Sequence, residues 1–169
     1  MTKFREAMPF PTEHMRLIGE ICTQWTIVEL VVLQAVCELS KISQSHARYL
    51  GGSIPFGTRV DMLTAYGVAL RETKAEGTIK IAKEIHVLGN DLRSAYILRC
   101  KYAHAELSIR EDDGPPMRSI YTVTKKIEIR DHILSISEME ADFDIIHDVY
   151  LKFIRFMQCR FSIVETSWL

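Results

Sequence analysis

The sequence predicts a mainly α fold, a bundle of four main helices with a small β-hairpin or meander before the last helix. Three segments within the first 105 residues, and a fourth at the end of the chain, carry apolar residues at the three- and four-residue steps of a helical face. Residues 105–135 alternate apolar and polar residues instead, which is the spacing of strands. The change of period, from helical to alternating and back, defines the predicted architecture.

Composition favours one folded domain over residues 1–169. The chain has 47% hydrophobic and 25% charged residues, and a chain of this length buries roughly 70% of the surface that its unfolded form exposes. No repeat and no low-complexity linker divides it. We therefore expect a single helical domain with a β-insert at about 105–135.

The first helix is predicted over residues 12–42. Pro11 stops any structure before it, and Thr12 can cap the free amides of the first turn. Its apolar face consists of Leu17, Ile18, Ile21, Trp25, Val28, Val32, Val36 and Leu39. Because the neighbouring residues Val31 and Leu33 are also apolar, the helix should be covered on more than one side.

A loop region separates this helix from the next two. The segment KISQSHARYLGGSIPFG, residues 41–57, contains three glycines and a proline, with room for one helical turn at SHARYL. Thr58 and Asp61 have the spacing of a capping box with the shorter acid, which predicts a helix to about residue 73. Gly77 should end that unit, and a long helix should follow from Thr78 to about residue 105.

The β-insert and the last helix complete the chain. Residues 105–137 alternate in polarity around a strong turn at 112–116 and are rich in β-branched residues, which indicates a hairpin or a three-stranded meander. Ser137 and Glu140 form a capping box. The apolar residues after it predict a helix to about residue 162.

Charge and hydropathy limit the partners that we expect. The formal net charge is −1, whereas a protein that grips nucleic acid along its backbone usually carries a basic face, so any such contact must be local. The apolar stretch at 17–39 includes Glu20 and Glu29, whereas a membrane-spanning helix needs about 20 mostly apolar residues with few charges. We predict a soluble core helix and no contact with a membrane.

The cysteines favour a reducing compartment. They are Cys22, Cys37, Cys100 and Cys159, which lie far apart and form no CxxC pair. Neither a disulfide framework nor a zinc ribbon is indicated, and the sequence shows no secretory leader. We therefore expect reduced thiols and a cytoplasmic protein.

The segment LRCKYAHAEL, residues 98–107, places residues suited to catalysis on a predicted helix. Arg99 offers a planar fork of donors that suits phosphate, and a histidine such as His104 can accept and return a proton near neutral pH. Five residues of regular helix change direction by roughly 140°. The two side chains can therefore meet only if the helix frays or turns near His104, or if the site lies between helices or subunits.

An arginine with a histidine suits cleavage of RNA without a metal. The ribose 2′-hydroxyl can attack its own phosphate if a base removes its proton and a cation stabilises the charge on the phosphoryl oxygens. The same spacing also arises by chance in ordinary helices. Cys100 and His104 could instead begin a zinc site or a nucleophilic dyad, but no second pair of ligands lies nearby in the sequence. We predict no metal and no cofactor.

The segment RCKYAH, from Arg99 to His104, is similar to the R-x4-6-H motif of the HEPN superfamily. Its place late in a long helix, after LGNDLRSAYIL, and an early helix with Trp25 and Glu29 fit that resemblance. The resemblance implies a metal-independent endoribonuclease, often a toxin or defence protein, whose symmetric dimer brings two arginine–histidine pairs into one cleft. It also implies noncatalytic relatives that bind nucleotides or partner proteins.

From this resemblance we expect Arg99 to bind phosphate and stabilise developing charge, while His104 acts as acid or base. Lys101 and Tyr102 could hold the RNA backbone or stack a base. These four residues form the candidate site.

Glu29 is a candidate supporting residue because an ionised carboxylate is costly to bury without partners. It lies in an apolar run and could pair with Arg99 or Arg93, and so orient the site. A purely structural ion pair is the alternative.

We expect a homodimer, because the first helix is apolar on more than one side and the chemistry gains from duplication across a two-fold axis. RNA or a nucleotide, and an antitoxin or another protein, are the further partners considered. Two other interpretations remain open, a noncatalytic HEPN-like dimer that binds a nucleotide or a protein, and a purely structural helical dimer.

Overall fold

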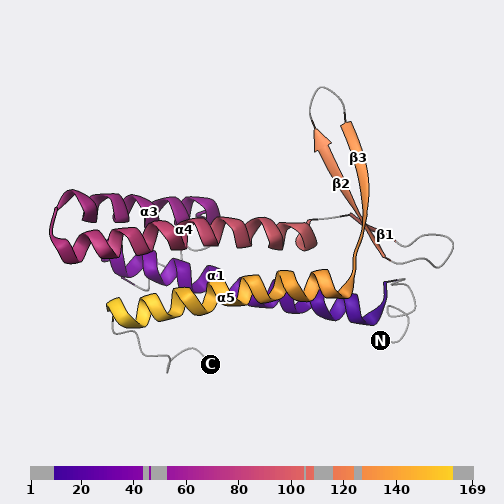
Figure 1. Cartoon of the computed structure of the whole chain (residues 1–169), viewed down its shortest axis with the longest axis horizontal. Helices are drawn as coiled ribbons and strands as arrows, with labels where there is room; N and C mark the ends of the chain where they lie inside the picture. Colours follow the sequence, from indigo (N-terminus) through magenta and orange to yellow (C-terminus); the bar gives the residue numbers. More distant parts are fainter. Residues whose placement is uncertain are drawn as a thin grey trace.

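Four long helices form the molecule in the computed structural model, which describes residues 10–43, 46, 53–104, 106–108, 116–123 and 127–161. They are α1 (Thr12–Ser40), α3 (Phe56–Glu72), α4 (Glu76–Ala103) and α5 (Ile136–Phe161). In Figure 1 they run along the length of an elongated bundle, with α3 beside α4 and α1 beside α5. The predicted mainly α fold with four main helices is confirmed.

The hydrophobic core lies between these two pairs of helices. Its largest fully buried side chains are Trp25, Phe153, Ile21, Leu63, Ile85, Leu92, Leu134, Met139, Ile146 and Met157. They come from α1, α3, α4 and α5 at helical spacing, apart from Leu134, which precedes α5. Each helix therefore buries the apolar stripe that its sequence predicts.

Among the described residues, α1 alone is long and apolar enough to cross a membrane, by length and composition only. Its inner face nevertheless packs into the core, where Ile21 and Val32 are fully buried. Its outer face carries Leu30, which is 61% exposed. One face of α1 is thus packed against the other helices, while residues of the other face remain exposed.

Prolines, rather than hydroxyl side chains, mark the starts of α1 and α3. Pro11 and Pro55 stand directly before these helices with φ of −58° and −56°, and no side-chain hydrogen bond caps either helix. The proline ring already fixes the φ that the chain needs to enter a helix. The predicted caps are therefore wrong: Thr12 is the first residue of α1, and the Thr58–Asp61 pair lies inside α3.

Two other helix boundaries also differ from prediction. The chain turns between α3 and α4 where Lys74 takes a left-handed φ of 57°, so Gly77 lies in the first turn of α4 instead of ending α3. At α5, the Ser135 hydroxyl accepts a hydrogen bond from the Glu138 amide at 3.1 Å. The capping pair thus stands two residues before the predicted Ser137–Glu140 pair.

The helices α3 and α4 approach each other closely at two glycines. A Cβ added to Gly67 would lie 2.9 Å from Ile85, and one added to Gly89 would lie 2.6 Å from Thr64. A larger residue at either position would push the helices apart, because protein interiors are packed to near crystal density.

The strands between α4 and α5 form a small sheet. They are β1 (Glu106–Ser108), β2 (Met117–Val123) and β3 (Ile127–Ile133), antiparallel and in the order β1-β2-β3. This order is a meander, and it projects from the end of the bundle where α4 ends and α5 begins (Figure 1). The predicted turn at 112–116, apart from Pro116, and the helical turn at 45–50, apart from His46, lie outside the described residues.

Candidate functional site

The candidate site lies where α4 extends past the start of α3. Phe56, the first residue of α3, stacks on Tyr96 of α4 with ring centroids 5.3 Å apart, and Trp25 of α1 contacts both rings. From Tyr96, α4 continues for about two more turns to Ala103. The ribbon of α3 ends before this part of α4 (Figure 1). The segment with Arg99 therefore forms one end of the bundle.

Arg99 and His104 meet at this end of α4. Nη1 of Arg99 lies 2.9 Å from Nε2 of His104. His104 follows the last residue of the helix, with φ −126° and ψ 5°, and its amide donates to the Cys100 carbonyl at 3.4 Å. Because the chain leaves the helix at His104, the imidazole can turn back toward Arg99. The sequence predicted that the two residues could meet within one chain if the helix ended near His104, and α4 does end there.

The contact defines the roles of the two groups. A guanidinium group only donates hydrogen bonds, so Nη1 of Arg99 is the donor in this contact and Nε2 of His104 is the acceptor. The side chain of His104 is exposed, so that solvent and a substrate can reach it.

One donor atom of Arg99 has no partner among the described residues. Its Nε atom is buried and has no hydrogen-bond acceptor in the described part of the chain. A buried donor without an acceptor costs roughly 1–3 kcal/mol. Only an acceptor that reaches Nε itself would remove that cost.

Tyr96 and Cys100 lie next to Arg99 on α4. A hydrogen bond with the Cys100 thiol raises the pKa of the Tyr96 phenol, burial and the Glu29 carboxylate also raise it, and the Arg99 cation opposes them. Tyr96 is therefore a neutral phenol at physiological pH, and it adds no charge to the site.

Glu29 and Arg93 have different partners from those predicted. A Glu29 carboxylate oxygen accepts the indole N–H of Trp25 at 2.6 Å. Arg93 instead pairs with Asp61, at 2.7 Å, and so links α4 to α3. No ion pair joins Glu29 to either Arg93 or Arg99 within the described residues. Neither of the two pairs considered for Glu29, with Arg99 or with Arg93, is present there, and the carboxylate contacts the indole of Trp25 instead.

Lys101 and Tyr102 point away from the Arg99–His104 contact, toward α5. Nζ of Lys101 lies 2.8 Å from the Asp142 carboxylate, and the Tyr102 hydroxyl donates to the same oxygen at 2.5 Å. Tyr102 is only 3% exposed. Its ring therefore packs in the core and presents no open face for a base. Both residues were predicted to contact RNA, but in the structure they connect α4 to α5.

Sequence reasoning missed Asp142. It occupies a core-facing position of α5, between the buried residues Met139 and Ile146 at helical spacing, and is itself buried. An acid at that place in an apolar pattern was the available signal, since buried carboxylates need partners.

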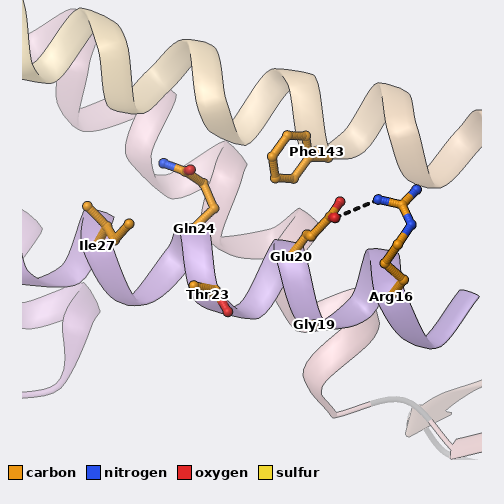
Figure 2. A pocket seen from close by; sticks show the side chains of 7 residues that line it. All are labelled: Arg16, Gly19, Glu20, Thr23, Gln24, Ile27 and Phe143. Carbon is orange, nitrogen blue, oxygen red and sulfur yellow. Dashed lines mark hydrogen bonds and ion pairs between the residues drawn. The ribbon is translucent and has the colours of Figure 1, made fainter. Parts of the chain in front are cut away.

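Two surface grooves lie away from the Arg99–His104 contact. The first, of about 350 Å³, runs between α1 and α5, where Phe143 of α5 faces Gln24 and Glu20 of α1 (Figure 2). The second, of about 600 Å³, lies between α3 and α4. Neither groove includes Arg99 or His104. His104 is an exposed residue at the end of α4 and lies outside both grooves.

No cluster of three or more His, Cys, Asp or Glu side chains that could hold a metal occurs in the described ranges. Cys100 and His104, the pair considered for zinc, gain no third ligand there.

No protein-family model, no curated protein and no solved structure matches this chain. Its own geometry defines its class, a mainly α protein with four long helices and an arginine–histidine contact at the end of α4.

Proposed function

We propose that the protein is a metal-independent endoribonuclease of HEPN type, with Arg99 and His104 as its catalytic residues. The observation that carries this proposal is the contact of 2.9 Å between a guanidinium and an imidazole at an exposed helix end. The planar fork of donors on the Arg99 guanidinium suits an anionic ligand. A phosphodiester supplies such an anion, and a neutral imidazole supplies the base.

Binding of the phosphate would itself release the base. The phosphate oxygens compete for the Arg99 guanidinium, and two of its nitrogens can hold two oxygens. As Nη1 of Arg99 turns to the phosphate, the lone pair on Nε2 of His104 becomes free. Substrate binding and activation of the base are thereby coupled through one hydrogen bond.

The reaction that follows uses the ribose itself. Nε2 of His104 takes the proton of the 2′-hydroxyl, whose oxygen attacks phosphorus while Arg99 stabilises the charge on the phosphoryl oxygens. The bond to the 5′-oxygen of the next nucleotide breaks, and that oxygen takes up the proton that His104 gained from the 2′-hydroxyl, which returns the imidazole to its starting form. The products are a 2′,3′-cyclic phosphate and a 5′-hydroxyl. DNA lacks the attacking hydroxyl and should survive.

We also propose that the protein acts as a homodimer. Ile97 lies on α4 two residues before Arg99, and at 66% exposed it is the most exposed large hydrophobic side chain in the described part. A two-fold interface over Ile97 would bury this side chain. Because Ile97 lies about 200° around α4 from Arg99, that interface would be on the other face of the helix from the Arg99 side chain.

Light scattering at micromolar concentration should report twice the mass of one chain. Ile97→Asp should yield monomers and reduced cleavage, because a charge cannot be buried without a partner. Leu30→Asp, on the outer face of α1, tests the other apolar surface that could form the interface. If Leu30→Asp yields monomers and Ile97→Asp does not, the interface lies on α1, and a monomeric wild type would contradict the homodimer.

Function as a toxin or defence protein in the cytoplasm is part of the same proposal, with RNA as substrate and an antitoxin as a protein partner. The four cysteines are free thiols, which favours a reducing compartment.

The second candidate is a noncatalytic module that binds a partner protein, and the groove between α3 and α4 favours it. Val68 and Val87 line this groove as exposed apolar side chains. Arg71 and Lys83 flank them and form no ion pair within the described residues, whereas the Asp61 carboxylate is already paired with Arg93. This combination of apolar floor and basic rim fits an amphipathic helix with acidic flanks.

A fluorescent amphipathic peptide of leucine and glutamate should bind this groove more tightly than the same peptide with lysine in place of glutamate. Val87→Asp should weaken binding about tenfold or more, because it removes apolar area and repels the glutamates. Equal binding of both peptides, or unchanged binding to Val87→Asp, would remove the groove as a docking site.

A further inference from the structure

A buried charged cluster ties the last turn of α4 to the start of α5. The carboxylate of Asp142, which is 7% exposed, accepts from Nζ of Lys101 at 2.8 Å and from the Tyr102 hydroxyl at 2.5 Å on one oxygen. Nζ of Lys101 also lies 3.4 Å from the Glu138 carboxylate, and Nδ1 of His132 lies 3.8 Å from the other oxygen of Glu138. Two adjacent residues of α4 are thus held by one acid of α5.

This cluster differs from the other ion pairs between the two helices. Lys152 pairs with Asp91 at 3.1 Å with an exposed ammonium, and Arg160 pairs with Glu84 at 2.9 Å, also accessible to solvent. Exposed pairs contribute little to stability, whereas a buried carboxylate is costly unless its partners stay in place. Asp142 therefore constrains the position of α4 more strongly than the two exposed pairs.

The part of α4 that the cluster holds needs such a constraint. Helix ends fray, and the last carbonyls of a helix have no partners within it. Among the described residues, the backbone bond that closes the end of α4 is the long 3.4 Å bond from the His104 amide to the Cys100 carbonyl. Lys101 and Tyr102 lie between Arg99 and His104 in sequence. If the helix ended one residue earlier or later, His104 would rotate away from Arg99 by about 100°.

We propose that Asp142 is a positioning residue: through Lys101 and Tyr102 it fixes the point where α4 ends, and so holds Arg99 and His104 in contact. The catalytic consequence rests on the proposed ribonuclease function. The geometric consequence, loss of the Arg99–His104 contact when Asp142 is changed, does not depend on that function.

The experiment compares Asp142→Asn with Asp91→Asn in the full chain. Both changes remove one carboxylate charge from a pair between α4 and α5, but Asp91 lies far from His104 in α4. The direct readout is the nitrogen NMR spectrum of labelled histidine side chains, with the His104 signals assigned from His104→Gln. The second readout is the rate of RNA cleavage, separated into kcat and KM.

In the wild type, the His104 signals should report a fixed tautomer with the proton on Nδ1. Asp142→Asn should convert them to those of a freely exchanging imidazole and lower kcat by roughly a hundredfold, since a misplacement of about 1 Å can have that effect. Asp91→Asn should leave the signals unchanged and kcat within about twofold. Tyr102→Phe, which removes one of the two donors to Asp142, should give an intermediate result.

The outcomes separate the two proposals. If Asp142→Asn leaves the His104 signals unchanged, the positioning role is overturned. If those signals change but the wild type cleaves no RNA, Asp142 still positions His104 and the ribonuclease proposal fails alone. If Asp142→Asn does not fold, Tyr102→Phe decides, because a spectrum identical to the wild type would then overturn the role.

Discussion

Arg99→Ala and His104→Ala should each remove most of the RNA cleavage by this protein. A positioned acid or base contributes about 10²- to 10⁴-fold, and a charge-stabilising donor about 10²- to 10³-fold. Both residues lie at the end of the bundle, so the melting temperature should change little. The measurement is the rate of cutting of an end-labelled RNA in excess chelator, beside circular dichroism of each variant.

Cys100→Ser is the control for this prediction. Cys100 lies next to Arg99 and is hydrogen-bonded to Tyr96, but it has no proposed role in the reaction, so this change should be milder. A contaminating ribonuclease would be indifferent to all three substitutions. Equal cutting by the wild type, Arg99→Ala and His104→Ala would therefore contradict the enzymatic proposal.

Trp25→Ala should lower the free energy of unfolding by about 3–5 kcal/mol. Trp25 is 1% exposed and lies with its ring centroid 4.6 Å from Phe56 and 5.7 Å from Tyr96, so the substitution opens a cavity between three helices. It also removes the indole N–H from the Glu29 carboxylate. Urea unfolding followed by circular dichroism measures the change.

Two variants separate the causes of this loss. Trp25→Phe keeps an aromatic ring but removes the N–H, so it should cost less than Trp25→Ala. Leu30→Ala, on the exposed face of the same helix, should change stability by no more than about 0.5 kcal/mol. If Trp25→Ala were as mild as Leu30→Ala, the aromatic cluster would not be part of the core.

The fold could be predicted because the apolar period is a local property of the chain. Trp25 and Val32 recur on one face of α1, and that face is buried. The helix starts were less predictable, because hydroxyl residues near Pro11 and Pro55 resembled caps although the prolines themselves begin the helices. The close approach at Gly89 could not be predicted, since it depends on how α3 crosses α4.

The site could be predicted only in part. The contact between Arg99 and His104 followed from a local condition, that the helix ends near His104. Lys101 follows Arg99 by two residues, which turns it by about 200° around the helix and away from Arg99. Tyr102 follows by three residues and lies only about 60° from Arg99, so its burial against α5 did not follow from the helix period. What lies on that side is Asp142, 40 residues from Tyr102 in sequence, and no local pattern places it there.

The most direct test of the central proposal is the replacement of one ribose at a mapped cleavage site by deoxyribose. The reaction should be run in excess chelator with the wild-type protein. If the 2′-hydroxyl is the nucleophile, that linkage should resist cleavage while neighbouring linkages are cut to 2′,3′-cyclic phosphate and 5′-hydroxyl ends. Cutting of the deoxyribose linkage at an undiminished rate, or failure to cut any RNA, would contradict the proposal that Arg99 and His104 catalyse attack by the ribose.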